Sequence, residues 1–334
     1  MFATLAGGYP APGTGERPHS SPEDRIRAVI AEQAEAGLGL LTDGSQRWPD
    51  PAADLGRVLI PAAQLAPRRD RPLTVDAWLF AQGLAGALPV KQCLPGPYSL
   101  GRRLAPSEAD RTSLTRALAE VLAGELVDLA AAGCPFIQVD EADAVLIGAD
   151  EAERRLFVDA QAGLLAGLGP AGERPHLSLA ISGGNADAAG PETIFAAAYD
   201  SHLFDLIAGP DNWRLITRAP AERGMILGVV DATSPTADDP ATIVWAIGYA
   251  ASGGRGETRI GIAPSGGLDL LSPSVARAKI DLLGETVRLV EARRETAIGA
   301  SLDPRATDAR SAALGNWRSR RRKPGSGKSG PSEP

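Results

Sequence analysis

Eight short apolar segments, separated by longer stretches with helical spacing, constrain the fold of this chain more than any other feature. Each segment is hydrophobic at most positions and is bounded by Gly, Pro or Asp. Strands of a parallel sheet need such segments because helices cover both faces of the sheet. The predicted strands are residues 2–7, 38–43, 89–94, 136–140, 177–182, 203–207, 225–231 and 259–263.

The stretches between these segments begin with helix-capping patterns. Ser21 is followed by Pro22 and Ser272 by Pro273, so each pair offers an N-cap and a proline at the first helical position. Ser107 precedes a long stretch of leucines at helical spacing. Eight strands alternating with helices predict one (β/α)₈ domain, a TIM barrel; an open doubly wound α/β sheet is the alternative.

Two segments depart from this alternation. Residues 44–71, after the second predicted strand, contain Pro49, Pro51, Pro61 and Pro67 and are expected to form a long loop, which is usually functional or mobile. Residues 301–334 form a predicted disordered tail, rich in basic residues and in Gly, Ser and Pro from residue 316 onward. We therefore expect a barrel over residues 1–300 and a solvated tail, with contact between the tail's basic cluster and a protein partner as the alternative.

Charge and cysteine content limit the class of protein. The chain has 34 Lys and Arg against 41 Asp and Glu, which argues against a nucleic-acid partner. No apolar run is long enough to cross a bilayer, and the first residues show no signal-peptide pattern. Cys93 and Cys134 are the two cysteines, too few for a disulfide framework. These features predict a soluble, cytoplasmic protein.

Polar residues follow the predicted strands, and in a barrel the carboxyl ends of the strands gather around one mouth. The adjacent acids Asp140 and Glu141 end a buried strand, where the energetic cost of desolvation favours a site role. Because the two carboxylates are adjacent, their pKa values should be pushed apart. We predict three catalytic residues, Asp140, Glu141 and Asp231. The predicted substrate-binding residues are Gly8, Asp43, Lys91, Ser182, Asn185 and Ser265.

Some of these residues also have a structural interpretation. Asp43 and Asp231 could each cap a helix or fix a turn. Lys91 is a charge within an apolar strand, for which pairing with an interior or rim acid is the simplest explanation, and a Schiff-base role has no further support in the sequence.

Taken in order, the strand ends resemble the catalytic domain of the cobalamin-independent methionine synthases. The most specific match is Ile-Gln-Val-Asp-Glu at residues 137–141, similar to the family's Ile-Gln-Ile-Asp-Glu. Five other stretches match at residues 3–10, 33–44, 90–97, 230–235 and 263–268. The resemblance covers most of residues 3–293 and implies the same barrel and a related methyltransferase.

That family binds its thiol substrate on zinc, which lowers the pKa of the thiol. The resemblance places the four zinc ligands at positions that are Ala180, Ser182, Gly266 and a residue near Ile207 in this chain, and none of these matches the family pattern. His176, His202 and Cys134 precede or begin their strands, far from the predicted mouth, while His19 lies in a Pro- and Gly-rich loop and Cys93 stands alone. We therefore predict that no metal or cofactor is bound, although a folate methyl donor remains compatible with the resemblance.

Four functions follow from the resemblance. The first is a divergent methyl or alkyl transferase that binds a small polar substrate without the zinc-bound thiolate, with Asp140 or Glu141 as general acid–base. The second is a non-catalytic descendant that binds a ligand or a protein partner. The third is a metal-free enzyme like the uroporphyrinogen decarboxylases, which share the superfamily. The fourth is a methionine synthase with replacement zinc ligands.

Overall fold

The computed structural model describes residues 1–11, 21–60, 66–252 and 254–302. The chain divides into two units, residues 1–287 and 288–334. In the second unit, the described residues 288–302 are helical. The predicted tail lies outside the described residues except for Ser301 and Leu302, so both the tail and the barrel boundary at residue 300 remain predictions.

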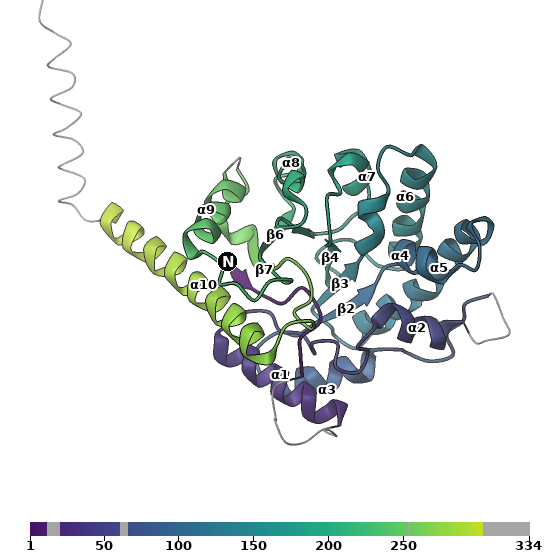
Figure 1. Ribbon diagram of the computed structural model, residues 1–334, viewed down its shortest axis with the longest axis horizontal. Coiled ribbons are helices and arrows are strands. Elements are labelled where there is room, and N and C mark those ends of the chain that lie inside the picture. Colours follow the sequence, from purple (N-terminus) through teal and green to yellow (C-terminus); the bar gives the residue numbers. More distant parts are fainter. Residues whose placement is uncertain (12–20, 61–65, 253, 303–334) are drawn as a thin grey trace, which may run out of the picture. The chain divides into compact units, whose positions relative to one another are not determined.

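The first unit contains a seven-stranded parallel sheet with the order β1-β7-β6-β5-β4-β3-β2 (Figure 1). Six strands form where the sequence predicts them, with ends shifted by at most two residues, whereas the first predicted strand, residues 2–7, ends at Ala3. The strands are β1 (Phe2–Ala3), β2 (Lys91–Pro95), β3 (Phe136–Asp140), β4 (His176–Ile181), β5 (Ser201–Asp205), β6 (Gly224–Val230) and β7 (Ile260–Pro264).

The eighth predicted strand, residues 38–43, is a correction to the expected fold. It forms only two isolated parallel bridges, Leu40 with Thr4 and Leu41 with Val90. Each leucine pairs on one side only, so the segment lacks the consecutive pairs that define a strand. These bridges nevertheless lie beside β1 and β2, which are the two edge strands of the sheet.

Helices alternate with the strands, and Figure 1 shows α1 to α9 around the outside of the sheet. Two predicted caps are confirmed in position: α1 follows Ser21, whose Oγ accepts a hydrogen bond from Asp24 N, and α5 follows Ser107. The helices are α1 (Pro22–Ala36), α2 (Pro51–Leu59), α3 (Val75–Ala85), α4 (Pro97–Leu104), α5 (Glu108–Ala131), α6 (Glu151–Leu165), α7 (Pro191–Ile194), α8 (Trp213–Arg218), α9 (Pro240–Ala251) and α10 (Pro273–Leu302).

Helix α2 corrects the expectation of an irregular loop over residues 44–71. Its N-cap Asp50 accepts a hydrogen bond from Ala53 N, and Pro51 occupies the first helical turn. Leu55 and Leu59 are buried. Proline therefore begins a helix here instead of excluding one.

The interior of the sheet is lined by one side chain from each of several strands. These form a buried cluster of Ala6, Leu40, Phe136, Ala180, Leu203, Ile226 and Ala263, against which Phe2 packs. Because side chains alternate between the faces of a strand, Gln138 and Asp140 share the inward face with Phe136. Among the described residues, no helix has the length and hydrophobicity needed to cross a membrane.

Candidate functional site

The predicted site residues gather around the carboxyl ends of the strands, with one exception. Asp140 is the last residue of β3, and Glu141, Ser182, Asp231 and Ser265 each directly follow a strand. Lys91 is the exception, since it begins β2 and is buried within the sheet. No two of the nine predicted residues share a direct hydrogen bond within the part of the chain that the structure describes.

A buried polar array links two of them through Gln138, which sequence reasoning missed. Lys91 Nζ donates hydrogen bonds to Leu5 O (2.6 Å) and to Gln138 Oε1 (2.5 Å). Gln138 Nε2 donates to Ala6 O (2.5 Å) and to Asp140 Oδ1 (2.6 Å). The side-chain amide thus connects an ammonium group to a carboxyl group without an ion pair. An amide on the inward face of an otherwise apolar strand was the available signal.

Burial shifts the pKa values of both ends of this array toward neutrality. It raises the pKa of Asp140 to about 7, an effect that the Gln138 hydrogen bond and the Lys91 charge oppose and the Glu141 charge reinforces. Burial also lowers the pKa of Lys91, which the nearby Cys93 and Asp140 raise. A carboxyl group with a pKa near neutrality can both accept and donate a proton under physiological conditions.

Glu141 has a different environment, although it is adjacent in sequence. Its carboxylate is fully buried and accepts hydrogen bonds from Tyr98 N (3.0 Å), Ser99 N (2.8 Å), Ser99 Oγ (2.6 Å) and Gln161 Nε2 (2.6 Å). Burial raises the pKa of Glu141, and the hydrogen bonds from Ser99, Tyr98 and Gln161 oppose that effect. The carboxylate therefore caps the first turn of α4, where unpaired N–H groups need an acceptor.

The side chains of Asp231 and Asp43 hold turns by accepting hydrogen bonds from the residue two positions further along the chain. Asp231 Oδ1 accepts hydrogen bonds from Thr233 N and Thr233 Oγ1 (both 2.8 Å). Burial raises the pKa of Asp231, but these bonds outweigh burial and hold it below its ordinary value. Asp43 Oδ1 accepts from Ser45 N (2.9 Å), and burial raises the pKa of Asp43. The structural interpretation of both residues therefore accounts for their contacts, and a catalytic role for Asp231 stays a prediction.

Three of the six predicted binding residues also join neighbouring loops. Ser265 Oγ accepts from Ala232 N (3.1 Å), and Asn185 Oδ1 accepts from Asp211 N (2.8 Å). Gly8 O accepts from Leu268 N (2.8 Å). Ser182 is partly exposed after β4. These contacts leave the binding roles as predictions.

Asp205 is a second residue that sequence reasoning missed. It ends β5 and is buried, and its Oδ1 accepts from Ile207 N (2.8 Å) and Ala208 N (2.9 Å). Its Oδ2 accepts from Gly183 N (3.0 Å), which joins the loops after β4 and β5. An aspartate that ends an apolar strand was the signal for it.

The described side chains do not fit a zinc site at this edge of the sheet. His176 begins β4, His202 lies in the first half of β5, and Cys134 precedes β3, so all three are toward the amino ends of the strands. Cys93 is in β2, where burial raises the pKa of its thiol. No three His, Cys, Asp or Glu side chains in the described ranges are grouped as metal ligands would be. Whether the protein carries zinc stays a prediction.

Comparison with known proteins gives two kinds of likeness, and no family model matches the chain. Two 5-methyltetrahydropteroyltriglutamate–homocysteine methyltransferases are similar over 75 residues, or 22% of this chain: that of Caulobacter vibrioides at 40% identity and that of Bradyrhizobium diazoefficiens at 37%. The match spans 10% of the length of these curated relatives.

Solved structures are similar over most of the chain. A B12-independent methionine synthase from Shewanella sp. W3-18-1, in complex with selenomethionine, has a TM-score of 0.73 at 16% identity and covers 88% of this chain and 98% of its own. A putative B12-independent methionine synthase from Listeria monocytogenes has a TM-score of 0.65 at 17% identity and covers 87% and 98%. A methyltransferase from Methanosarcina mazei has a TM-score of 0.57 at 11% identity, covering 85% and 94%. The chain therefore shares the fold of the cobalamin-independent methionine synthases and, over one segment of 75 residues, is similar to the two methyltransferases in sequence.

Proposed function

We propose that this chain is a divergent methionine synthase-like barrel that binds a small polar substrate at the carboxyl ends of its strands. In this proposal it transfers a methyl or alkyl group without a zinc-bound thiolate. Its two sequence relatives are methyltransferases, which supports group transfer. The Shewanella structure contains selenomethionine, which supports an amino-acid-like substrate. The observation that carries the proposal is the array of Lys91, Gln138 and Asp140, which holds a carboxyl group with a pKa of about 7 at this edge.

The proposal includes a ring of strands closed through residues 38–43, which bridge β1 and the start of β2 without forming a strand of their own. Lys91 in β2 donates to Leu5 O, and Gln138 in β3 donates to Ala6 O. Leu5 and Ala6 follow β1, which lies at the other edge of the seven-stranded sheet. The bridges of Leu40 and Leu41 span the same gap. These contacts support a single mouth to which β1, β2 and β3 contribute together.

In the proposed reaction Asp140 is the general base. A bond forms between the acceptor atom and the methyl carbon as the bond to the donor breaks, and the donor keeps that electron pair. The acceptor loses its proton to Asp140, whose pKa near 7 leaves part of the population ionised at neutral pH. Gln138 orients the carboxyl, and Lys91 in turn orients Gln138. A folate is the methyl donor we propose.

Methyl transfer to homocysteine by the purified full chain tests the proposal. The assay supplies 5-methyltetrahydropteroyltriglutamate, follows methionine by mass spectrometry and measures zinc content in the same sample. We expect turnover without stoichiometric zinc, and a loss of at least about 100-fold in Asp140→Asn. Asp159→Asn is the matched control, because Asp159 is an exposed partner of Arg116. About one zinc per chain, or full activity in Asp140→Asn, would refute the zinc-free mechanism.

One observation favours a non-catalytic, ligand-binding descendant as the second candidate. The carboxylates of Glu141 and Asp231, both predicted to be catalytic, already accept hydrogen bonds within the chain. A thermal-shift screen of folates, thiols and tetrapyrroles separates the candidates. A stabilising ligand with no turnover in the native chain would favour the binding protein, and tetrapyrrole turnover would favour the decarboxylase-like alternative.

A further inference from the structure

A cavity of about 700 Å³ lies at the amino ends of the strands, opposite the candidate site. Its lining includes Phe2 at the start of β1, His176 at the start of β4, Ser201 at the start of β5 and Met225 near the start of β6. Arg259 lines it just before β7. The volume is within the range of small-molecule sites.

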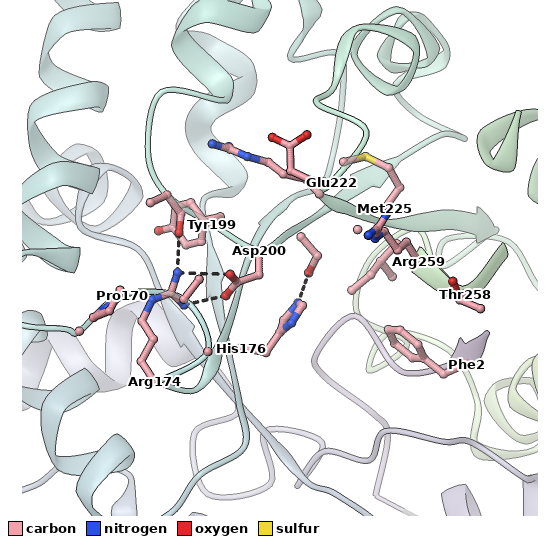
Figure 2. Close-up of a pocket in the computed structure, with 18 residues that line it drawn as sticks. Phe2, Pro170, Arg174, His176, Tyr199, Asp200, Glu222, Met225, Thr258 and Arg259 are labelled. Atoms are coloured by element: carbon pink, nitrogen blue, oxygen red, sulfur yellow. Dashed lines mark hydrogen bonds and ion pairs between the residues drawn. The ribbon is translucent and has the colours of Figure 1, made fainter. Parts of the chain in front are cut away.

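The wall around His176 is held by hydrogen bonds and stacking. His176 Nε2 lies 2.8 Å from Ser201 Oγ, and the imidazole stacks on Phe136 with ring centroids 4.4 Å apart. Arg174 pairs with Asp200 (2.6 Å) and donates to Ala198 O (2.8 Å). Figure 2 shows His176 between the Arg174–Asp200 pair on one side and Phe2 and Arg259 on the other. The polar groups are therefore fixed before any ligand arrives.

The cavity carries more positive charge than its carboxylates neutralise. The charge of Arg174 is matched by Asp200. Arg223 instead donates to two neutral acceptors, Phe195 O (2.9 Å) and Ala197 O (3.0 Å), and Arg259 is exposed. Neither Arg223 nor Arg259 forms an ion pair with any residue that the structure describes. Glu222 is the remaining acid of the lining and is exposed.

Arg255 adds a further positive charge behind the wall of the cavity. Arg255 is buried, and its guanidinium donates only to carbonyl oxygens among the described residues, those of Arg223, Ala250, Ile216 and Ala219. Burial lowers the pKa of Arg255 and the charge of Arg259 lowers it further, whereas the charge of Glu222 raises it. An anion in the cavity would relieve that repulsion.

We propose that this cavity binds a small organic carboxylate with an apolar body. The carboxylate faces Arg223 and Arg259, which offer charge-assisted hydrogen bonds, and the body packs against Phe2 and Met225. Neither inorganic phosphate nor a neutral aromatic molecule satisfies both halves of this lining. The site is distinct from the one that holds Asp140, because the two lie at opposite ends of the same strands.

Phenylacetate is the probe, with its neutral isostere phenylacetamide and the small anion acetate as comparisons. The full chain has three histidines, so imidazole NMR signals report on the cavity once His176→Gln has assigned the His176 signal. We expect phenylacetate to shift that signal with a Kd of about 1 mM or tighter. Phenylacetamide and acetate should each bind at least about fivefold more weakly.

Three variants locate the binding. Arg259→Gln should weaken phenylacetate at least about fivefold by removing an exposed charge without disturbing the core. Ala198→Trp, at an exposed lining position, should abolish binding by filling the cavity. Arg214→Gln removes an exposed guanidinium on α8 and should leave phenylacetate binding unchanged. No binding by phenylacetate, equal binding by phenylacetamide or acetate, or unchanged binding in either cavity variant would overturn the proposal.

Discussion

At the carboxyl ends of the strands, the carboxylates of Glu141 and Asp205 accept hydrogen bonds from the backbone of nearby loops. At the amino ends, the guanidiniums of Arg223 and Arg255 donate to loop carbonyls in the same way. Opposite charges thus perform the same structural task at the two ends of one sheet. The difference lies in the space beside them, since the amino end has a cavity of about 700 Å³ with an uncompensated charge.

This comparison shows that a charged side chain at a strand end indicates function only when hydrogen bonds and ion pairs within the chain do not already account for it. At the carboxyl end, Asp140 stands apart because one side-chain amide holds it and burial raises its pKa to about 7. At the amino end, Arg259 stands apart because it is exposed beside the cavity. We base the two functional proposals on these residues and treat Glu141 and Arg255 as framework.

Glu141→Ala should have the largest effect, and it tests whether Glu141 has a structural role. The substitution leaves Tyr98 N, Ser99 N and the Gln161 amide without their buried acceptor. We expect the free energy of unfolding to fall by about 4 kcal/mol, measured by urea denaturation. Glu141→Gln should lose less, because its side-chain oxygen still accepts. If Glu141→Ala unfolds like the native chain, Glu141 is not framework and its predicted catalytic role gains support.

Asp140 should make the stability of the protein depend on pH, and comparison with Asp140→Asn separates this effect from that of Glu141, whose pKa burial also raises. Burial raises the pKa of Asp140 from its ordinary 3.8 to about 7, so between these values the folded chain binds more protons than the unfolded chain. Stability from this residue is therefore complete below about pH 4 and lost as the pH rises through 7. Between pH 5 and pH 8 the native chain should lose about 2 kcal/mol more than Asp140→Asn.

The variant Lys91→Met provides a second test of the pH dependence of stability. The Lys91 charge lowers the pKa of Asp140, so its removal should raise that pKa and move the loss of stability to higher pH. Asp159→Asn, at an exposed position, should follow the native chain at every pH. Parallel pH profiles for the native chain and Asp140→Asn would show that Asp140 is ionised throughout, and they would remove the basis for its role as a base.

The strand positions were predictable from sequence because each long strand is a local apolar segment. Residues 38–43 read equally well as a strand, yet Leu40 and Leu41 pair on one side each, which depends on where β1 and β2 end. Helix α2 had a local signal in Asp50 and Pro51, but the number of prolines in residues 44–71 concealed it.

The candidate site was predictable only in part, because residue roles depend on distant segments. The end of β3 was identified correctly as the place where two acids meet the edge of the sheet. Asp140 and Glu141 differ in environment because α4 brings Ser99 to Glu141, whereas β2 brings Lys91 to Gln138, which holds Asp140. The cavity at the amino ends is built from several loops, so no single segment of sequence indicates it.

Asp231→Ala should have the smallest effect and the opposite pH dependence. The hydrogen bonds from Thr233 and Ser234 hold the pKa of Asp231 below its ordinary 3.8, although burial raises it. Its contribution is therefore present above about pH 4 and lost as the pH falls through the folded-state pKa. We expect a loss of about 1 kcal/mol at pH 7 and almost none in strong acid, measured by urea unfolding, with Asp231→Asn intermediate. If the free energy of unfolding falls by the same amount at both pH values, the loss comes from the turn and not from the charge of Asp231. That result would weaken the contrast with Asp140.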